Sequence, residues 1–355
     1  MFPVAKPVLP DLGRYGAYLE KIHERVWLTN FGALHEELTE RLKELLGVRH
    51  LLLVANGTLA LQVAYRALDV SGPVLTTPFS FVATTSSMAW EGLEPLFVDI
   101  DERSWDLDPR LLEGSPPASA VVPVHVYGNP CDVEAIEAFA KARAMPVIYD
   151  AAHAFGSTID GKSVLSWGDA STLSFHATKI FHTAEGGAIV FRDEDRYRRA
   201  RSLINFGLQD ELPTGILGIN AKLSEYHAAI GLTLLDRVGD LLEHRAELAE
   251  DYRRALSNHV ELQEWHAGGS PNGSYAPILL SSESELNRVA SQLAAEGIQT
   301  RRYFRPSLNR LPWPNQVECP KSEDVAGRVL CLPLYSDLTR ADVRYIAERV
   351  IAAVG

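Results

Sequence analysis

One lysine lies in a connection whose residues suit chemistry better than solubility. The stretch STLSFHATKIFHTAEGGAIVF extends from Ser171 to Phe191, and its two ends predict short strands over 171–175 and 187–191. Lys179 lies between them, close to hydroxyl and imidazole side chains and ahead of two adjacent glycines. A lysine in a connection is usually a solvated surface charge. A lysine forms a Schiff base only as the uncharged amine, so an environment that lowers its pKa would make Lys179 a nucleophile.

A phosphate-binding site is predicted at the start of a helix. Asn56, Gly57 and Thr58 follow an apolar strand expected over 51–54 and open the next helix. Free N–H groups, the helix dipole and the Thr58 hydroxyl would together attract an anion, although a turn without a ligand is the simpler interpretation of these residues alone. The pattern GxxxxGK[ST] is missing here, which argues against a nucleotide P-loop, and the missing GxGxxG weakens a dinucleotide interpretation.

A carboxylate follows another predicted strand. Asp150 comes directly after the strand expected over 146–149, where it would either cap a helix or pair with a protonated ring nitrogen of a ligand. His153 is close enough in sequence to contact the same ligand, although a lone histidine is more often structural. A phosphate site, an acidic ring partner and the lysine Lys179, in this chain order, are what pyridoxal 5′-phosphate needs. The sequence therefore predicts this cofactor.

Strands and helices alternate around these residues. We expect apolar strands over 51–54, 74–77, 96–99, 121–126 and 146–149. A helix with Asp132 as its N-cap lies between the last two. This alternation indicates an α/β fold with a mostly parallel central sheet covered on both faces. Function collects at the carboxyl ends of such strands, and Gly57, Phe81, Asp150 and Lys179 lie at or shortly after those ends.

The pattern changes after about residue 240. The segment 220–238 has helical periodicity, with Asn220 as a candidate N-cap, and a charged helix is expected over 241–256. The following elements are a strand over 276–280, a helix with a capping box of Ser282 and Glu285, an extended segment over 298–304, a strand over 329–332 and a helix from Thr339. We therefore predict a large cofactor-binding domain over 1–239 and a smaller C-terminal α+β domain over 240–355.

Composition excludes several classes of function. The chain has 355 residues, 46% of them hydrophobic and 23% charged, which is ordinary for a soluble enzyme. Its apolar runs fall short of the roughly 20 residues that a membrane span requires, and the N-terminus lacks the basic start of a signal peptide. The formal net charge of −12 makes nucleic acid a poor partner. The cysteines Cys131, Cys319 and Cys331 show no metal-ligand spacing, so we expect reduced thiols in a cytoplasmic protein without a metal site.

Four ordered motifs carry a resemblance to a known family. NGTLAL, DAAHAFG, SFHATK followed by EGGA, and NAKLSEYHAAIGL resemble the sugar aminotransferases of the DegT/DnrJ/EryC1/StrS group, which depend on pyridoxal 5′-phosphate. The resemblance extends from Trp27 to about Arg301. It implies an aspartate-aminotransferase-like fold (fold type I) and a homodimer with two active sites at its interface.

The resemblance also implies a role for individual residues. Lys179 would bind the cofactor aldehyde, Asp150 would pair with the pyridine nitrogen, and His153 would lie near the ring hydroxyl. Phe81 would stack on the cofactor ring. The predicted phosphate contacts are Gly57, Thr58 and Ser174, together with Asn220 donated by the neighbouring subunit.

The reaction implied by the resemblance is transfer of an amino group from L-glutamate to C4 of a nucleotide-linked 4-keto-6-deoxy sugar, in deoxyamino sugar biosynthesis. The motifs look most similar to enzymes that make dTDP-4-amino-4,6-dideoxyglucose. The alternatives are a GDP-perosamine-type or another C4 or C3 sugar aminotransferase and, less favoured, a non-transaminating cofactor enzyme or a regulator. Lys179 would move the proton between the donor and the cofactor. Weaker candidates for substrate contact are His182, Arg301, Tyr303 and Trp27.

Two positions depart from the family pattern. Ala184 replaces a glycine that many relatives have before EGG, and we expect a loop there that does not need a positive φ. Asn309 replaces a frequent histidine, which leaves the distal nucleotide contacts open.

Overall fold

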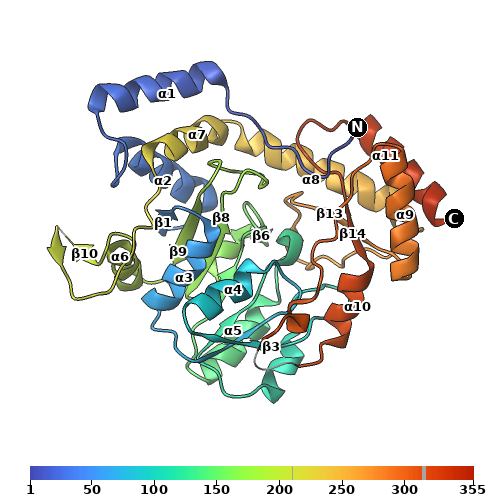
Figure 1. Ribbon diagram of the computed structural model, residues 1–355, viewed down its shortest axis with the longest axis horizontal. Coiled ribbons are helices and arrows are strands. Elements are labelled where there is room, and N and C mark those ends of the chain that lie inside the picture. The colour runs from blue at the N-terminus through green and yellow to red at the C-terminus, as the bar shows by residue number, and fades with distance from the viewer. Residues whose placement is uncertain (210, 314–316) are drawn as a thin grey trace.

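The centre of the computed structural model, which describes residues 1–209, 211–313 and 317–355, is a mixed sheet (Figure 1). Its strands are β1 (His50–Val54), β2 (Pro73–Thr76), β3 (Glu94–Phe97), β4 (Ala120–Val122), β5 (Ile148–Asp150), β8 (Ala170–Ser174) and β9 (Gly187–Phe191). They form the orders β3-β2-β4 and β5-β8-β9-β1, and parallel bridges from Val121 to Val147 and from Val124 to Asp150 join β4 to β5. Most neighbours are parallel, whereas β9 is antiparallel to both β8 and β1. This confirms the predicted sheet and fold class.

Helices cover both faces of this sheet. They are α1 (Leu12–Arg25), α2 (Ala33–Leu46), α3 (Gly57–Ala67), α4 (Ala83–Trp90), α5 (Val133–Ala142), α6 (Glu194–Leu203) and α7 (Glu225–Leu235). Alternate residues of β1 belong to two hydrophobic clusters: Leu51 and Leu53 pack with α2 and α7, and Leu52 and Val54 pack with α3 and α6. The strands are apolar on both sides because each face is buried under helices.

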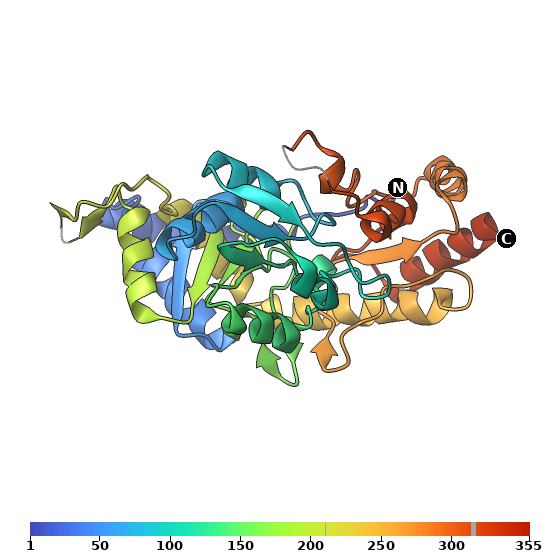
Figure 2. The same ribbon diagram turned by 90° about the horizontal axis from the view of Figure 1, so that it is seen from below.

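The C-terminal part lies beside the sheet rather than on it (Figure 2). It consists of α8 (Val238–Leu256), α9 (Glu283–Ala295), α10 (Pro320–Arg328), α11 (Arg340–Val354), β13 (Ala276–Leu279) and β14 (Val329–Leu332). A separate hydrophobic cluster extends from Leu248 to Ala353, and the division of the chain into two domains near residue 240 stays a prediction. Phe2 packs on this cluster and bridges to Ile298, so the first residues of the chain lie on the C-terminal part.

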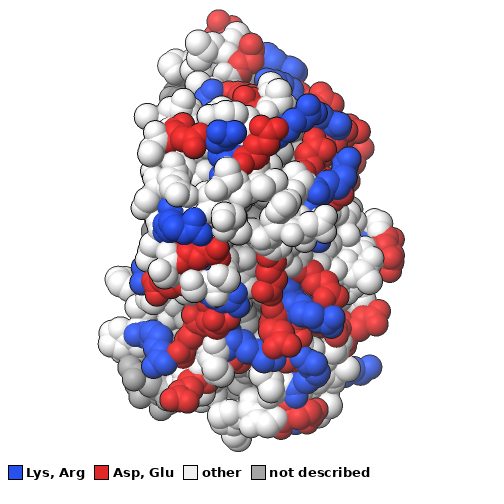
Figure 3. All heavy atoms as spheres, turned by 90° about the vertical axis from the view of Figure 1, so that its right-hand side faces the viewer, with Lys and Arg blue, Asp and Glu red and all other residues white. Residues whose placement is uncertain are grey.

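Short strand pairs complete the fold. They are β6 (Thr158–Ile159) with β7 (Lys162–Ser163) and β12 (Gly269–Ser270), and β10 (Leu208–Gln209) with β11 (Leu212–Pro213). In the described parts of the chain, every helix is too short or too polar to cross a membrane. Figure 3 shows acidic and basic side chains interspersed over one side of the molecule.

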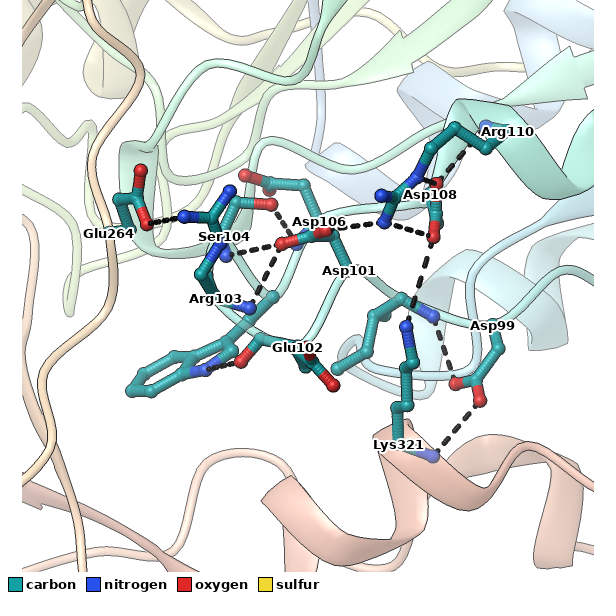
Figure 4. Close-up of polar contacts among 12 residues, drawn as sticks. Asp99, Asp101, Glu102, Arg103, Ser104, Asp106, Asp108, Arg110, Glu264 and Lys321 are labelled. Carbon is teal, nitrogen blue, oxygen red and sulfur yellow. Dashed lines mark hydrogen bonds and ion pairs between the residues drawn. The ribbon is translucent and has the colours of Figure 1, made fainter.

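A carboxylate from the sheet caps a helix of the C-terminal part. Asp99, just after β3, accepts hydrogen bonds from the N–H groups of Lys321 (3.0 Å) and Ser322 (2.9 Å) at the start of α10. In the loop that follows, Arg103 forms an ion pair with Glu264 at 3.2 Å (Figure 4). Because a carboxylate at a helix start satisfies free N–H groups and stabilises the positive end of the helix dipole, Asp99 fixes the start of α10 against the segment that follows β3.

The structure corrects three local predictions. The helix predicted from Asn220 begins at Glu225 with Ser224 as its N-cap. The preceding backbone pairs elsewhere, since the Ala221 carbonyl accepts a hydrogen bond from the N–H of Ala55 at 2.8 Å. The strand predicted over 121–126 ends at Val122 and is followed by a 3₁₀ turn over 126–128.

The third correction concerns the predicted capping box at α9. Ser282 does cap the helix by accepting from the N–H of Glu285 at 3.1 Å. The Glu285 carboxylate, however, accepts from the N–H of Ser281 at 2.8 Å instead of from Ser282. At α11, by contrast, Thr339 and Asp342 form a complete capping box.

Candidate active site

A cavity of about 340 Å³ opens at the carboxyl ends of the central strands. Seven predicted residues line it, namely Gly57, Thr58, Phe81, Asp150, His153, Ser174 and Lys179. Tyr275, Tyr303 and Phe304 of the C-terminal part close the opposite wall. Each predicted residue lies at or after the end of a strand, and these strand ends meet at one edge of the sheet, as expected for parallel strands.

Lys179 is held by the connection between β8 and β9. The N–H of Phe175 donates to the Gly186 carbonyl and that of Ala177 to the Ala184 carbonyl, both at 2.8 Å, so the connection is a narrow hairpin. A Cβ on Gly186 would lie 2.0 Å from the Thr183 hydroxyl, which explains why this position needs glycine. Burial lowers the pKa of Lys179 to about 8, and the nearby Asp150 carboxylate opposes this shift. Near neutral pH, the uncharged fraction of this amine is therefore far larger than that of an ordinary lysine with a pKa of 10.5.

Asp150 forms the floor of the cavity at the end of β5. It is 6% exposed and accepts hydrogen bonds from the Thr84 hydroxyl at 2.8 Å and from the N–H of Ala152 at 3.1 Å. Burial raises the pKa of Asp150, and these hydrogen bonds oppose that shift. A buried carboxylate with few charged neighbours favours a cationic partner, which suits a protonated ring nitrogen.

His153 lies on the side of the cavity and is uncharged. Its Nδ1 accepts from the N–H of Tyr127 at 3.3 Å, so the ring proton belongs on Nε2. Burial lowers the pKa of His153 well below its ordinary value. Phe304 stacks on its ring, with centroids 5.5 Å apart. The histidine can therefore donate one hydrogen bond to a ligand without bringing a charge into the cavity.

The start of α3 forms an anion cradle with the end of β8. Asn56 caps the helix by accepting from the N–H of Leu59 at 2.9 Å, as the N-cap of α3. A Cβ on Gly57 would lie 2.9 Å from the Ser174 Cβ, so only glycine lets the helix approach the strand this closely. The first N–H groups of the helix and the hydroxyls of Thr58 and Ser174 lie at the same cavity wall. This set of donors fits a phosphate group.

Phe81 and Asn220 are both exposed, but only Phe81 lines the cavity. The Phe81 side chain is 56% exposed, which suits a ring that stacks on a ligand. Asn220 is exposed, pairs with Asn205 in an isolated bridge and does not line this cavity. Its predicted contact with the phosphate of a neighbouring subunit stays a prediction.

Among the weaker candidates, only Tyr303 lines the cavity. His182 is 3% exposed and its Nε2 lies 2.8 Å from the Val8 carbonyl, so its role is structural. Arg301 bridges to Cys331 in the C-terminal part, and Trp27 lies in the exposed connection between α1 and α2.

Asn309, the second departure from the family pattern, is also structural. It is 2% exposed, and its side-chain amide donates to the Glu323 carboxylate at 2.6 Å and to the Val317 carbonyl at 2.9 Å.

Several residues that line the cavity or contact its lining were not predicted from the sequence. Thr84 binds the Asp150 carboxylate, and its only signal was a run of hydroxyl residues in FVATTSS. His176 and Glu185 flank the Lys179 hairpin 3.7 Å apart at the cavity wall. Tyr275 and Phe304 come from the C-terminal part and carry no local pattern that indicates a site.

Ala184 contradicts the prediction that its loop needs no positive φ. Its φ is 66°, in the left-handed region where glycine is favoured. We expect Ala184→Gly to raise the free energy of unfolding by about 0.5–1 kcal/mol, since the strain relieved outweighs the added entropy of the unfolded chain. Urea unfolding of the cofactor-free protein measures this change, with Ala138→Gly at an exposed position inside α5 as a control that should destabilise. Equal destabilisation by both variants would contradict the prediction.

The family model of the DegT/DnrJ/EryC1/StrS aminotransferases matches residues 14–351. The chain belongs to this family. The family membership confirms the predicted enzyme class and its cofactor, pyridoxal 5′-phosphate, whose phosphate and ring nitrogen fit the anion cradle and the Asp150 carboxylate described above.

Relatives of this aminotransferase resemble it over its whole length. The protein named dTDP-4-amino-4,6-dideoxy-D-glucose transaminase of Shigella dysenteriae is 41% identical, over 98% of this chain and 97% of that protein. GDP-perosamine synthase of Escherichia coli O157:H7 is 30% identical, over 98% and 97%. The crystal structure of DesI in the presence of its TDP-sugar product superimposes with a TM-score of 0.93 at 34% identity, over 99% of this chain and 93% of that chain.

Proposed function

We propose that this aminotransferase moves an amino group from L-glutamate to C4 of dTDP-4-keto-6-deoxyglucose and so forms dTDP-4-amino-4,6-dideoxyglucose. The observation that carries this proposal is the 41% identity, over nearly the full length of both chains, to a protein named for that product. The resemblance to the DesI structure, which was determined with a TDP-sugar, supports the choice of nucleotide.

Each residue of the cavity has a separate role in this reaction. Pyridoxal 5′-phosphate, when bound, supplies the aldehyde that takes up the amino group and the ring that withdraws electrons from it. Lys179 would hold that aldehyde as a neutral amine and, once free, would remove the proton from the donor Cα as a base. Asp150 keeps the ring nitrogen protonated, and Phe81 packs on the ring face.

The remaining groups hold the ligand and its charge. The start of α3 and the hydroxyls of Thr58 and Ser174 bind the phosphate. His153 donates from Nε2 on the hydroxyl side of the ring. Lys179 would then return the proton taken from the donor Cα, and the donor would leave as its 2-keto acid before the sugar ketone receives the amino group, so the kinetics should be ping-pong.

A cytoplasmic homodimer is part of the same proposal. Asn220 is exposed and lies outside the cavity of its own chain, as expected for a residue that reaches the phosphate of a partner subunit. The side chains of Leu217 and Ile219 beside it are also exposed, at 87% and 44%. Burial of such apolar surface would stabilise a dimer.

A GDP-linked acceptor is the second candidate, because GDP-perosamine synthase is also similar over nearly the full chain. The two functions share the cofactor and the donor and differ in the nucleotide and the sugar. Glutamate first converts the purified enzyme to its amine form, with loss of the visible absorbance band. Individual keto sugars are then added, and return of the band identifies the acceptor.

We expect the band to return with dTDP-4-keto-6-deoxyglucose at concentrations at least about tenfold below those needed for the GDP-linked 4-keto-6-deoxymannose. Mass spectrometry and NMR of the product would then locate the amine at C4. Return of the band with the GDP sugar alone, or an amine at C3, would overturn the proposal. A band that glutamate leaves unchanged would exclude glutamate as the donor.

A further inference from the structure

Tyr127 has a backbone conformation that is costly for an aromatic residue. Its φ and ψ are 59° and 13°, in the left-handed region, and its side chain is 1% exposed. Residues with bulky side chains seldom adopt this conformation. Gly128, the next residue, has a φ of 92°, and a Cβ there would lie 2.8 Å from the His153 carbonyl. Strain of this kind beside an active site points to a function for the strained residue.

Tyr127 contacts both walls of the cavity without lining it. Its N–H donates to Nδ1 of His153 at 3.3 Å, on the wall formed by the large domain. Its hydroxyl donates to the main-chain carbonyl of Tyr303, on the wall formed by the C-terminal part. Since the cavity lining includes His153 and Tyr303 but not Tyr127, any effect of Tyr127 on a bound ligand is transmitted through these neighbours.

Three rings lie nearly parallel, two of them in the cavity wall and that of Tyr127 outside the cavity lining. Phe304 is stacked on His153 with centroids 5.5 Å apart and 2° between the planes, and on Tyr127 at 5.8 Å and 10°. Phe79 and Trp105 pack edge-on against Tyr127 at 6.1 and 6.2 Å and fix its ring from behind. Interiors packed this closely do not deform freely, so a shift of Phe304 displaces His153.

We propose that Tyr127 is a positioning residue that holds Phe304 and His153 in place and so couples the C-terminal wall of the cavity to the histidine beside the cofactor. The hydroxyl fixes the chain that carries Phe304, and the N–H fixes the tautomer and orientation of His153. The proposal depends on the cofactor of the family and not on which sugar is the acceptor.

Tyr127→Phe tests this role because it keeps the ring and the N–H and removes only the hydroxyl. The Tyr303 carbonyl then loses its donor inside the protein, and the segment that carries Phe304 is released. We expect the cofactor-free variant to bind pyridoxal 5′-phosphate about tenfold more weakly than wild type. We also expect a changed visible circular dichroism of the bound cofactor, which reports the asymmetry around its ring.

Tyr252→Phe is the matched control. Tyr252 is 3% exposed, and its hydroxyl donates to the Pro333 carbonyl at 3.0 Å inside the C-terminal part, away from the cavity lining. It should lower the melting temperature as Tyr127→Phe does and leave cofactor affinity and circular dichroism unchanged. Wild-type affinity and spectrum in Tyr127→Phe would overturn the proposal, as would equal changes in both variants.

A second variant decides the question if Tyr127→Phe does not fold. Phe79→Leu keeps the hydrogen bond from Tyr127 to Tyr303 and removes the ring that packs edge-on against Tyr127 and Phe304 without lining the cavity. The proposal predicts weaker cofactor binding and the same spectral change in this variant. A wild-type spectrum with wild-type affinity in Phe79→Leu would overturn it.

Discussion

Lys179→Ala is expected to abolish both transamination and the visible absorbance band of the bound cofactor. Lys179 is the amine that reaches the cavity between β8 and β9, and the reaction needs it as nucleophile and as proton carrier. Loss of both roles should lower kcat by about 10⁴-fold or more. The absorbance of protein dialysed against buffer that contains the cofactor measures the loss of the band. Single-turnover rates with glutamate measure the loss of transamination.

The pH dependence of cofactor capture gives an independent check on Lys179. Only the uncharged amine attacks the aldehyde, so capture by the cofactor-free protein should accelerate as pH rises and level off above about 8, the pKa of this buried lysine. An ordinary lysine would keep accelerating capture towards pH 10.5. Lys141→Ala, at an exposed position of α5, is the control and should match wild type. A normal absorbance band in Lys179→Ala would refute the assignment of the cofactor lysine.

Asp150→Asn is expected to lower kcat between about 10² and 10⁴-fold while the cofactor stays attached to Lys179. Removal of one member of a buried ion pair leaves the other charge without its partner, which costs about 3–5 kcal/mol. The ring nitrogen would lose its proton, and the ring would withdraw electrons less well. Single-turnover rates with glutamate measure the effect, and the visible band should persist at a shifted wavelength.

The melting temperature of Asp150→Asn shows whether its lower rate comes from the chemistry or from unfolding. Burial raises the pKa of Asp150, so in the cofactor-free protein the folded state disfavours the charged carboxylate that the unfolded chain carries at neutral pH. The contribution of Asp150 to stability therefore falls as pH rises from the ordinary pKa of an aspartate to the raised pKa of the folded state. The cofactor-free Asp150→Asn variant should melt at a higher temperature than wild type at pH 7, and a lower melting temperature would contradict this account.

Thr84→Val should weaken the action of the Asp150 carboxylate without removing it. The variant removes the hydroxyl that donates to the Asp150 carboxylate at 2.8 Å, and we expect kcat to fall by about tenfold, as for a hydrogen bond to a charged group. Thr233→Val is the control, since Thr233 is 2% exposed and its hydroxyl donates to the Ala229 carbonyl within α7. Equal rates for the two valine variants would show that Thr84 acts only through stability.

Local features of the fold followed from local sequence. Asp132 caps α5 and Thr339 caps α11 as predicted, since an N-cap hydrogen bond joins residues only a few positions apart. The strand over 187–191 has its predicted bounds. Predictions failed where backbone groups far away in the sequence competed for the hydrogen bonds of a helix. The hydrogen bond between Ala221 and Ala55 keeps the chain extended ahead of α7, so this helix begins only after Ser224, which caps it.

The sequence by itself determined the cofactor and predicted residues that lie together at one wall of the cavity. Gly57, Asp150 and Lys179 each follow a strand, and because parallel strands end at one edge of a sheet, their order along the chain was enough to predict a common site. Only the tertiary structure decided which residues form the opposite wall of the cavity. Phe304 reaches the cavity, and Tyr127 reaches the residues of its walls, through packing between segments far apart in the chain, and contacts of that kind leave no periodicity or spacing in the sequence that reasoning about local structure can detect.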